Sequence, residues 1–231
     1  MRIATVGTVL QLMRSQGIWK TLKSLKSHLE DKYLDYRLGI STSEIKTKQE
    51  LGLARDDERP YIPSDYRSFR KLMKILDIHE GRDVFVDFGA GMGRSVIFAG
   101  LYPFRRIVGV EISPELCRVA KTNVNLARPK LRCKDIAVVT SDAVTFPIPP
   151  DMTVAYFFNP FTGVILDTVL ENIRQSLCEV PRQIRFVCND YSSESQFSRQ
   201  IQGCHWLLLQ KRISLEQKGQ IGSIYLNTGI T

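Results

Sequence analysis

Three glycines on alternate positions follow a short apolar run that contains one carboxylate. Residues 84–93 read Val-Phe-Val-Asp-Phe-Gly-Ala-Gly-Met-Gly, so Asp87 lies two positions before Gly89. Glycines let the backbone turn tightly and approach a ligand, because they have no Cβ. A dinucleotide-binding loop is disfavoured, since Arg94 occupies the place of its third glycine and Asp87 would repel a pyrophosphate. The stretch favours a ligand that carries an ammonium or a sulfonium.

Polar residues also follow three further apolar segments of the chain. Glu111 ends residues 106–111, and its carboxylate is suited to accept two hydrogen bonds from a ribose diol. Residues 136–140 and 153–158 are followed by Ser141-Asp142-Ala143 and by Asn159-Pro160-Phe161. Open α/β sheets bind ligands at the carboxyl ends of their parallel strands, so we expect these groups along one edge of a sheet.

The four apolar segments are predicted to be strands, and the first of them is predicted to be buried on both faces. A helix is expected to follow the glycines, from Arg94 to Leu101. Ser113-Pro114-Glu115 has the features of another helix start: a serine N-cap, a proline at the first helical position and an acid in the first turn. Residues 183–188 predict a fifth strand, and residues 205–213 and 221–226 predict a β-hairpin around Gly219. The expected fold class is α/β, with a mainly parallel sheet closed by an antiparallel hairpin.

In this order, the four motifs resemble those of the class I S-adenosylmethionine-dependent methyltransferases over about residues 61–231. The resemblance implies a Rossmann-like fold with seven strands and S-adenosyl-L-methionine as the cofactor. Asp87 and the glycine loop would hold the methionine part, Glu111 the ribose hydroxyls, and Asp142 with Ala143 the adenine. The full set of cofactor-binding residues that it implies is Tyr61, Asp87, Gly89, Ala90, Gly91, Gly93, Glu111, Ile112, Asp142, Ala143 and Asn159.

Tyr61 belongs to this set because of its place before a predicted helix, Arg67 to Leu76, for which Ser64 is the expected N-cap. In related methyltransferases the segment before this helix folds over the cofactor. Packing against the helix is the alternative role for such a tyrosine.

Asn159, Pro160 and Phe161 are the expected catalytic residues. The Asn159 side-chain oxygen and the Pro160 carbonyl can accept hydrogen bonds from an amine. Phe161 or Phe158 can stack on a flat target or on an alkylammonium. The stretch resembles that of a group of small bacterial methyltransferases and, more distantly, of the non-SET histone lysine methyltransferases. A protein lysine amine is therefore the first acceptor considered, and RNA, DNA or a small molecule the alternative. An ordinary strand-to-helix turn, and a non-catalytic binding protein with this fold, also stay open.

The first 60 residues are predicted to form a helical, basic extension of the methyltransferase domain at residues 61–231. Residues 1–29 carry five basic residues and no acid. Within residues 9–34, apolar side chains and lysines recur at helical spacing: Ile18, Leu22, Leu25 and Leu29, with Lys20, Lys23 and Lys26 beside them. Such a helix can lie on a membrane surface, or pack against the domain or another subunit. Residues 52–60 are polar and predicted to be a linker.

Length and composition are those of one globular domain with a modest extension. The chain has 231 residues and a formal net charge of +8. Its five cysteines and three histidines lack metal-ligand spacing, so no metal site is expected. No apolar stretch approaches the roughly 20 residues of a transmembrane helix, and no secretory signal is evident, so a cytoplasmic location is expected. The basic patches can attract nucleic acid, anionic lipid or an acidic protein, or be only a solvated face.

Overall fold

The computed structural model describes residues 18–215 and 219–229, and its strands form one seven-stranded sheet. The order is β3-β2-β1-β4-β5-β7-β6, in which the first five strands are parallel and β7 runs antiparallel to β5 and β6. This confirms the predicted sheet with its antiparallel hairpin. The strands are β1 (Val84–Phe88), β2 (Arg106–Glu111), β3 (Ile136–Thr140), β4 (Val154–Phe158), β5 (Arg185–Asp190), β6 (Leu207–Ser214) and β7 (Ile221–Asn227).

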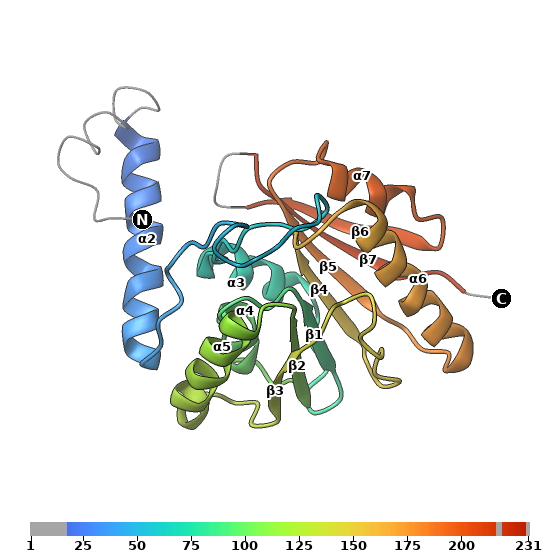
Figure 1. The fold of residues 1–231 in the computed structure, drawn as a ribbon, viewed down its shortest axis with the longest axis horizontal. Helices are drawn as coiled ribbons and strands as arrows, with labels where there is room; N and C mark the ends of the chain where they lie inside the picture. Colours follow the sequence, from blue (N-terminus) through green and yellow to red (C-terminus); the bar gives the residue numbers. More distant parts are fainter. Residues whose placement is uncertain (1–17, 216–218, 230–231) are drawn as a thin grey trace.

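Helices cover both faces of the sheet (Figure 1). One layer holds α3 (Tyr66–Ile75), α4 (Arg94–Gly100) and α5 (Pro114–Ala127), which continues into the short 3-10 helix η1 (Arg128–Lys130). The other layer holds α6 (Gly163–Glu179) and α7 (Gln196–Gly203). A further helix, α2 (Ile18–Leu38), lies at one end of the molecule beside α3 (Figure 1). Within the described residues, no helix has the length and apolar character needed to cross a membrane.

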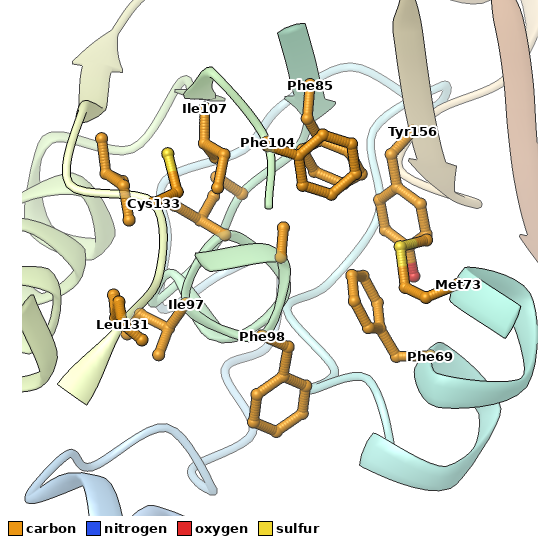
Figure 2. Packing of buried hydrophobic residues seen from close by; sticks show 14 of the residues in the cluster. Phe69, Met73, Phe85, Ile97, Phe98, Phe104, Ile107, Leu131, Cys133 and Tyr156 are labelled. Atoms are coloured by element: carbon orange, nitrogen blue, oxygen red, sulfur yellow. The ribbon is translucent and has the colours of Figure 1, made fainter. Parts of the chain in front are cut away.

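Aromatic rings fill the two cores on either side of β4. Tyr156 points into the core under α3, where the ring of Phe69 meets it edge-on at 5.4 Å and Phe85 stacks on it at 5.5 Å (Figure 2). The next residue, Phe157, faces the core under α6 and stacks on Phe88 at 4.9 Å. Successive side chains of a strand point to opposite faces, so the end of β4 is packed from both sides.

Side-chain caps begin the helices at α3 and α5. Ser113 caps α5 as predicted, because its hydroxyl accepts a hydrogen bond from the Leu116 amide at 3.4 Å. The prediction of Ser64 as the cap of α3 is wrong: Asp65 caps this helix, and its carboxylate accepts from the Ser68 amide at 2.8 Å. Serine and aspartate are both good N-caps. The helix starts at Tyr66, one residue earlier than predicted, and this makes Asp65 the flanking residue.

Buried ionic contacts fix α2 to the domain; we call the group of Arg94, Asp31, Asp35 and Thr42 the Arg94 cluster. The Arg94 guanidinium lies 3.0 Å from Asp35 Oδ2 and 3.4 Å from Asp31 Oδ2, and donates to Thr42 Oγ1 at 2.6 Å. A planar guanidinium with five N–H donors can serve such a set of acceptors at once. Burial raises the pKa of Asp31 to about 6, although Arg94 opposes this.

The predicted membrane-contact segment, residues 9–34, falls only partly within the described residues. Residues 1–17 lie outside them, and the side chains of α2 are described from Leu25 onwards. The division into an extension at residues 1–60 and a domain at residues 61–231 stays a prediction.

Candidate functional site

A cavity of about 460 Å³ lies at the carboxyl ends of the parallel strands. Its volume is in the range of small-molecule sites, roughly 300–1,000 Å³. The structure brings most of the predicted site residues together in its lining: Tyr61, Gly89, Ala90, Gly91, Glu111, Ile112, Asp142, Ala143, Asn159, Pro160 and Phe161. Two predicted residues, Asp87 and Gly93, are outside this lining.

The glycines of the loop make room for protein side chains as well as for a ligand. A Cβ on Gly89 would lie 2.6 Å from Pro160 Cβ, and one on Gly91 would lie 2.2 Å from the Tyr61 ring. Gly93 precedes α4 with a φ of +84°, and a Cβ there would lie 3.1 Å from Ala120 Cβ in α5. Gly93 therefore lets two helices approach each other, and its predicted contact with a cofactor stays a prediction.

Two carboxylates are buried at this end of the sheet, Glu111 in the cavity lining and Asp87 outside it. Asp87 accepts a hydrogen bond from the hydroxyl of Ser95, a residue of the lining. Burial, with a smaller effect of nearby Glu111, raises the pKa of Asp87 to about 7, while the Ser95 hydrogen bond opposes the rise. Glu111 accepts from the Gly91 and Ser113 amides at 2.7 and 2.9 Å, and burial raises its pKa as well.

Neither carboxylate forms an ion pair with a basic side chain in the described part of the chain. A cation placed beside them would favour their charged forms and would itself be stabilised. The arrangement is therefore suited to a positively charged ligand.

Asp87 is expected to make the free energy of unfolding fall as pH rises from about 4 to about 7. In this window the folded protein keeps a proton on Asp87 that the unfolded chain has released, because an unperturbed aspartate titrates near pH 4. The contribution, up to about 4 kcal/mol, is complete below pH 4 and is lost as pH passes 7. Urea denaturation of the wild type and of Asp87→Asn across this range measures it. A difference between the two proteins that does not change with pH would contradict the assignment.

A segment over the cavity, residues 51–62, contributes to its wall; we call it the roof. Arg55 of the roof donates to Asp142 Oδ2 at 3.0 Å, and its guanidinium lies 2.9 Å from Glu58 Oε1. Glu58 forms an isolated antiparallel bridge with Phe161. The prediction of residues 52–60 as a linker is therefore wrong. No local pattern marks the roof, because Asp142 is 87 positions from Arg55 in the chain.

The roof also supplies the cap of α6. Thr162 precedes this helix without a side-chain cap, and the Val164 amide donates instead to Asp57 Oδ2 at 3.0 Å. The Thr162 amide donates to the Asp57 carbonyl at 3.0 Å. These contacts place the roof against the strand-to-helix turn that contains Asn159. Lining residues of the roof and its flanks that sequence reasoning missed are Leu51, Leu53, Arg55, Glu58, Arg59, Pro60, Ile62 and Ser64.

Asn159 follows β4 with a left-handed φ of +39°. Only one of the two polar atoms of its side-chain amide has a hydrogen-bond partner among the described residues. Its Nδ2 donates to Asp190 Oδ1 at 2.8 Å, whereas its Oδ1 is buried with no hydrogen-bond partner among the described residues. A buried acceptor without a partner costs about 1–3 kcal/mol. Asn159 lines the cavity, so a hydrogen-bond donor bound there would supply the missing partner.

Asp190 fixes this orientation of the Asn159 amide. Its carboxylate is buried and also accepts from the Tyr191 amide at 2.7 Å, from the Ser198 hydroxyl at 2.6 Å and from the Ser195 hydroxyl. A carboxylate only accepts, so it selects the NH₂ side of the Asn159 amide. Asp190 was missed because the fifth strand was predicted to end at residue 188, whereas β5 extends to Asp190.

Three aromatic side chains, Phe158, Phe161 and Tyr191, belong to the cavity lining together with Asn159. Phe158 lies 5.5 Å from Tyr191 between ring centroids, and Phe161 meets the buried ring of Phe157 edge-on at 6.4 Å. Such walls suit an alkyl chain, a flat ring or an alkylammonium.

Comparison with known proteins identifies the fold. No family model and no curated protein sequence matches the chain. Solved structures with a similar fold include an RNA methyltransferase from Salinibacter ruber in complex with S-adenosyl-L-homocysteine, with 20% identity and a TM-score of 0.53 over 74% of this chain and 96% of that one. A SAM dependent methyltransferase from Aquifex aeolicus gives 14% identity and a TM-score of 0.55 over 71% and 91%. A ribosomal protein L11 methylase from Lactobacillus delbrueckii gives 14% and 0.52 over 70% and 77%. The chain therefore has the Rossmann-like methyltransferase fold.

Proposed function

We propose that this protein is an S-adenosyl-L-methionine-dependent methyltransferase and that it N-methylates a lysine amine of a protein. The observation that carries the proposal is the side-chain oxygen of Asn159 at the end of β4, a buried acceptor that has no partner among the described residues. Glu111 in the lining, and Asp87 behind Ser95, offer negative charge to a cationic cofactor. The cavity would thus bind the cofactor and the acceptor amine side by side.

The residues of the cavity fit S-adenosyl-L-methionine. Its volume, the Glu111 carboxylate in its lining and the Asp87 carboxylate behind Ser95 suit a ligand of this size that carries an ammonium and a sulfonium. Asp87 and the glycine loop would hold the methionine part, Glu111 the ribose, and Asp142 with Ala143 the adenine. Ile112 and Tyr61 would complete the walls. When bound, the cofactor supplies a methyl group on a positively charged sulfur, which is open to in-line attack.

The protein's part in the reaction is to hold the acceptor nitrogen. Asn159 Oδ1 and the Pro160 carbonyl would accept hydrogen bonds from a neutral amine and direct its lone pair, and Asp190 would keep the Asn159 amide from rotating. Phe158, Phe161 and Tyr191 would pack along an alkyl arm and exclude water. A lysine has such an arm with an amine at its end, and this favours lysine over a nucleobase.

Asn159→Ala is expected to reduce methyl transfer by at least about 100-fold while binding of S-adenosyl-L-methionine changes little, because removal of one positioned polar group typically costs this much in the rate. Calorimetry measures cofactor binding, and transfer of a labelled methyl group measures the rate. Asn125→Ala, at an exposed position of α5, is the matched control and should behave as the wild type. Full transfer by Asn159→Ala would show that the acceptor lies elsewhere.

The acceptor is tested by incubating the protein with labelled cofactor and fractionated cell extract, followed by protease or nuclease. Label that is lost to protease and recovered as methyllysine after acid hydrolysis supports the proposal. Label that resists protease and is lost to nuclease would identify a nucleic-acid methyltransferase instead. Lack of binding at sub-millimolar S-adenosyl-L-methionine would refute the assignment as a methyltransferase.

A further inference from the structure

The outward face of α2 carries a row of exposed apolar and aromatic side chains, which we call the α2 stripe. Its members are exposed to 38% at Leu25, 58% at Leu29, 57% at Tyr33 and 82% at Tyr36. Spacings of four, four and three residues place them on one side of the helix. Figure 1 shows α2 at the edge of the molecule, with one side toward α3 and the other away from the sheet. Single exposed leucines are common on protein surfaces, whereas a continuous row of apolar side chains is typical of a surface that binds another protein or a membrane.

Two of the acids of α2, Asp31 and Asp35, are buried against the domain, and the third, Glu30, is partly exposed near Lys26. All three acids of the helix are engaged with arginines of the domain: Asp31 and Asp35 with Arg94, and Glu30 with Arg67. The outward side keeps cations. Exposed basic residues flank the α2 stripe on both sides, with Lys32 on one side and with Lys26 and Arg37 on the other.

Arg37 also extends over the α2 stripe. It donates to Tyr33 Oη at 3.3 Å, and its guanidinium carbon lies 5.9 Å from the centre of the Tyr33 ring. The exposed side of α2 is therefore both apolar along its middle and cationic along its borders.

We infer that the α2 stripe docks on an anionic lipid surface, with α2 parallel to the membrane plane. Leu25 and Leu29 would enter the boundary between headgroups and acyl chains, where Tyr33 and Tyr36 can keep their hydroxyls among the headgroups. Lys26 and Lys32 can bury their alkyl stems and extend their ammonium groups to lipid phosphates. The predicted cytoplasmic location would bring this face to the leaflet that carries anionic lipids.

Charge decides between a lipid surface and other occupants of this face. A second copy of the chain docked through the same stripe would bring two cationic borders together, which is unfavourable. Nucleic acid would neutralise the lysines and leave the two leucines without an apolar partner. An anionic membrane offers phosphate groups to the lysines and an apolar interior to the leucines.

The test is co-sedimentation of the full-length protein with vesicles. We expect binding to vesicles that contain phosphatidylglycerol, much weaker binding to pure phosphatidylcholine, and a decrease with added salt. The double variant Lys26→Gln/Lys32→Gln should weaken binding roughly 10- to 30-fold, since each basic residue near such a surface contributes about 1 kcal/mol. Leu25→Ser/Leu29→Ser should weaken it about tenfold or more, through lost apolar burial.

Matched controls separate the α2 stripe from surface properties in general. Leu126→Ser/Leu208→Ser removes two exposed leucines from α5 and β6, and Lys121→Gln removes an exposed lysine from α5. Both variants should bind vesicles as the wild type does. Circular dichroism checks that each variant is folded. Equal binding to both kinds of vesicle, or binding that neither α2 variant weakens, overturns the inference. So does a dimer that Leu25→Ser/Leu29→Ser converts to a monomer in light scattering.

Discussion

Arg94→Met is expected to lower the free energy of unfolding by about 3 to 5 kcal/mol, the usual cost of removing one partner from a buried ion pair. Arg94 is 3% exposed, and its loss would leave Asp31 and Asp35 buried without their cation. A typical domain is stable by only about 5 to 15 kcal/mol, so this change removes a large part of the total. Urea denaturation measures the loss as a lower midpoint.

Two further variants test whether the lost stability of Arg94→Met comes from the buried charges of Asp31 and Asp35. Arg132→Met removes an exposed arginine paired with exposed Glu80, and should change stability by less than about 1 kcal/mol. Adding Asp31→Asn and Asp35→Asn to Arg94→Met should recover much of the loss, because the buried negative charges disappear with the positive one. If the triple variant is no more stable than Arg94→Met, lost packing rather than unpaired charge explains the effect.

Asp87→Ala is expected to weaken binding of S-adenosyl-L-methionine by about 100-fold or more. Asp87 is buried behind Ser95, and a charge there acts on a cationic ligand through a medium of low dielectric constant. Removing one member of a buried charge pair typically costs 2 to 5 kcal/mol of binding free energy. Calorimetry measures the change, and Glu80→Gln, an exposed carboxylate, serves as the control.

The raised pKa of Asp87 also predicts how the affinity for S-adenosyl-L-methionine depends on pH. With a pKa of about 7, Asp87 is mostly protonated at pH 6 and mostly ionised at pH 8 in the free protein. A cationic ligand prefers the ionised form, so affinity should rise roughly tenfold over this interval and protons should be released on binding. Asp87→Asn should bind weakly with little change across the interval. Equal affinity of the wild type at both pH values would mean that Asp87 does not sense the ligand.

The parts of the fold that sequence could predict are those with local signals. The glycine loop after β1, the acid at the end of β2 and the serine cap of α5 are each marked by a few adjacent residues, and all lie where expected. They meet at the carboxyl ends of the strands because parallel strands all end at the same edge of a sheet. Most of the predicted site residues lie in the lining of the cavity, although much of that lining was not predicted.

The rest depends on contacts between distant residues. The Arg94 cluster joins residues 52 to 63 positions apart, and the roof reaches Asp142 over 87 positions. No local sequence pattern in α2 or in the roof identifies the distant residues that they contact. Asp190 was missed for a related reason: β5 extends two residues past its apolar run because it pairs with β4 and with β7.

The place of β7 has a consequence for the order in which the protein forms during synthesis. β7 follows β6 in the chain but inserts between β5 and β6, where Asp190 pairs with Ile221 and Asn189 with Gly222. While a ribosome is still releasing residues 221–227, the edge of β5 next to Asp190 has no strand partner. Pairings between strands far apart in sequence are slow to form. The carboxylate that orients Asn159 would thus reach its final environment late, after the other strands of the sheet have formed.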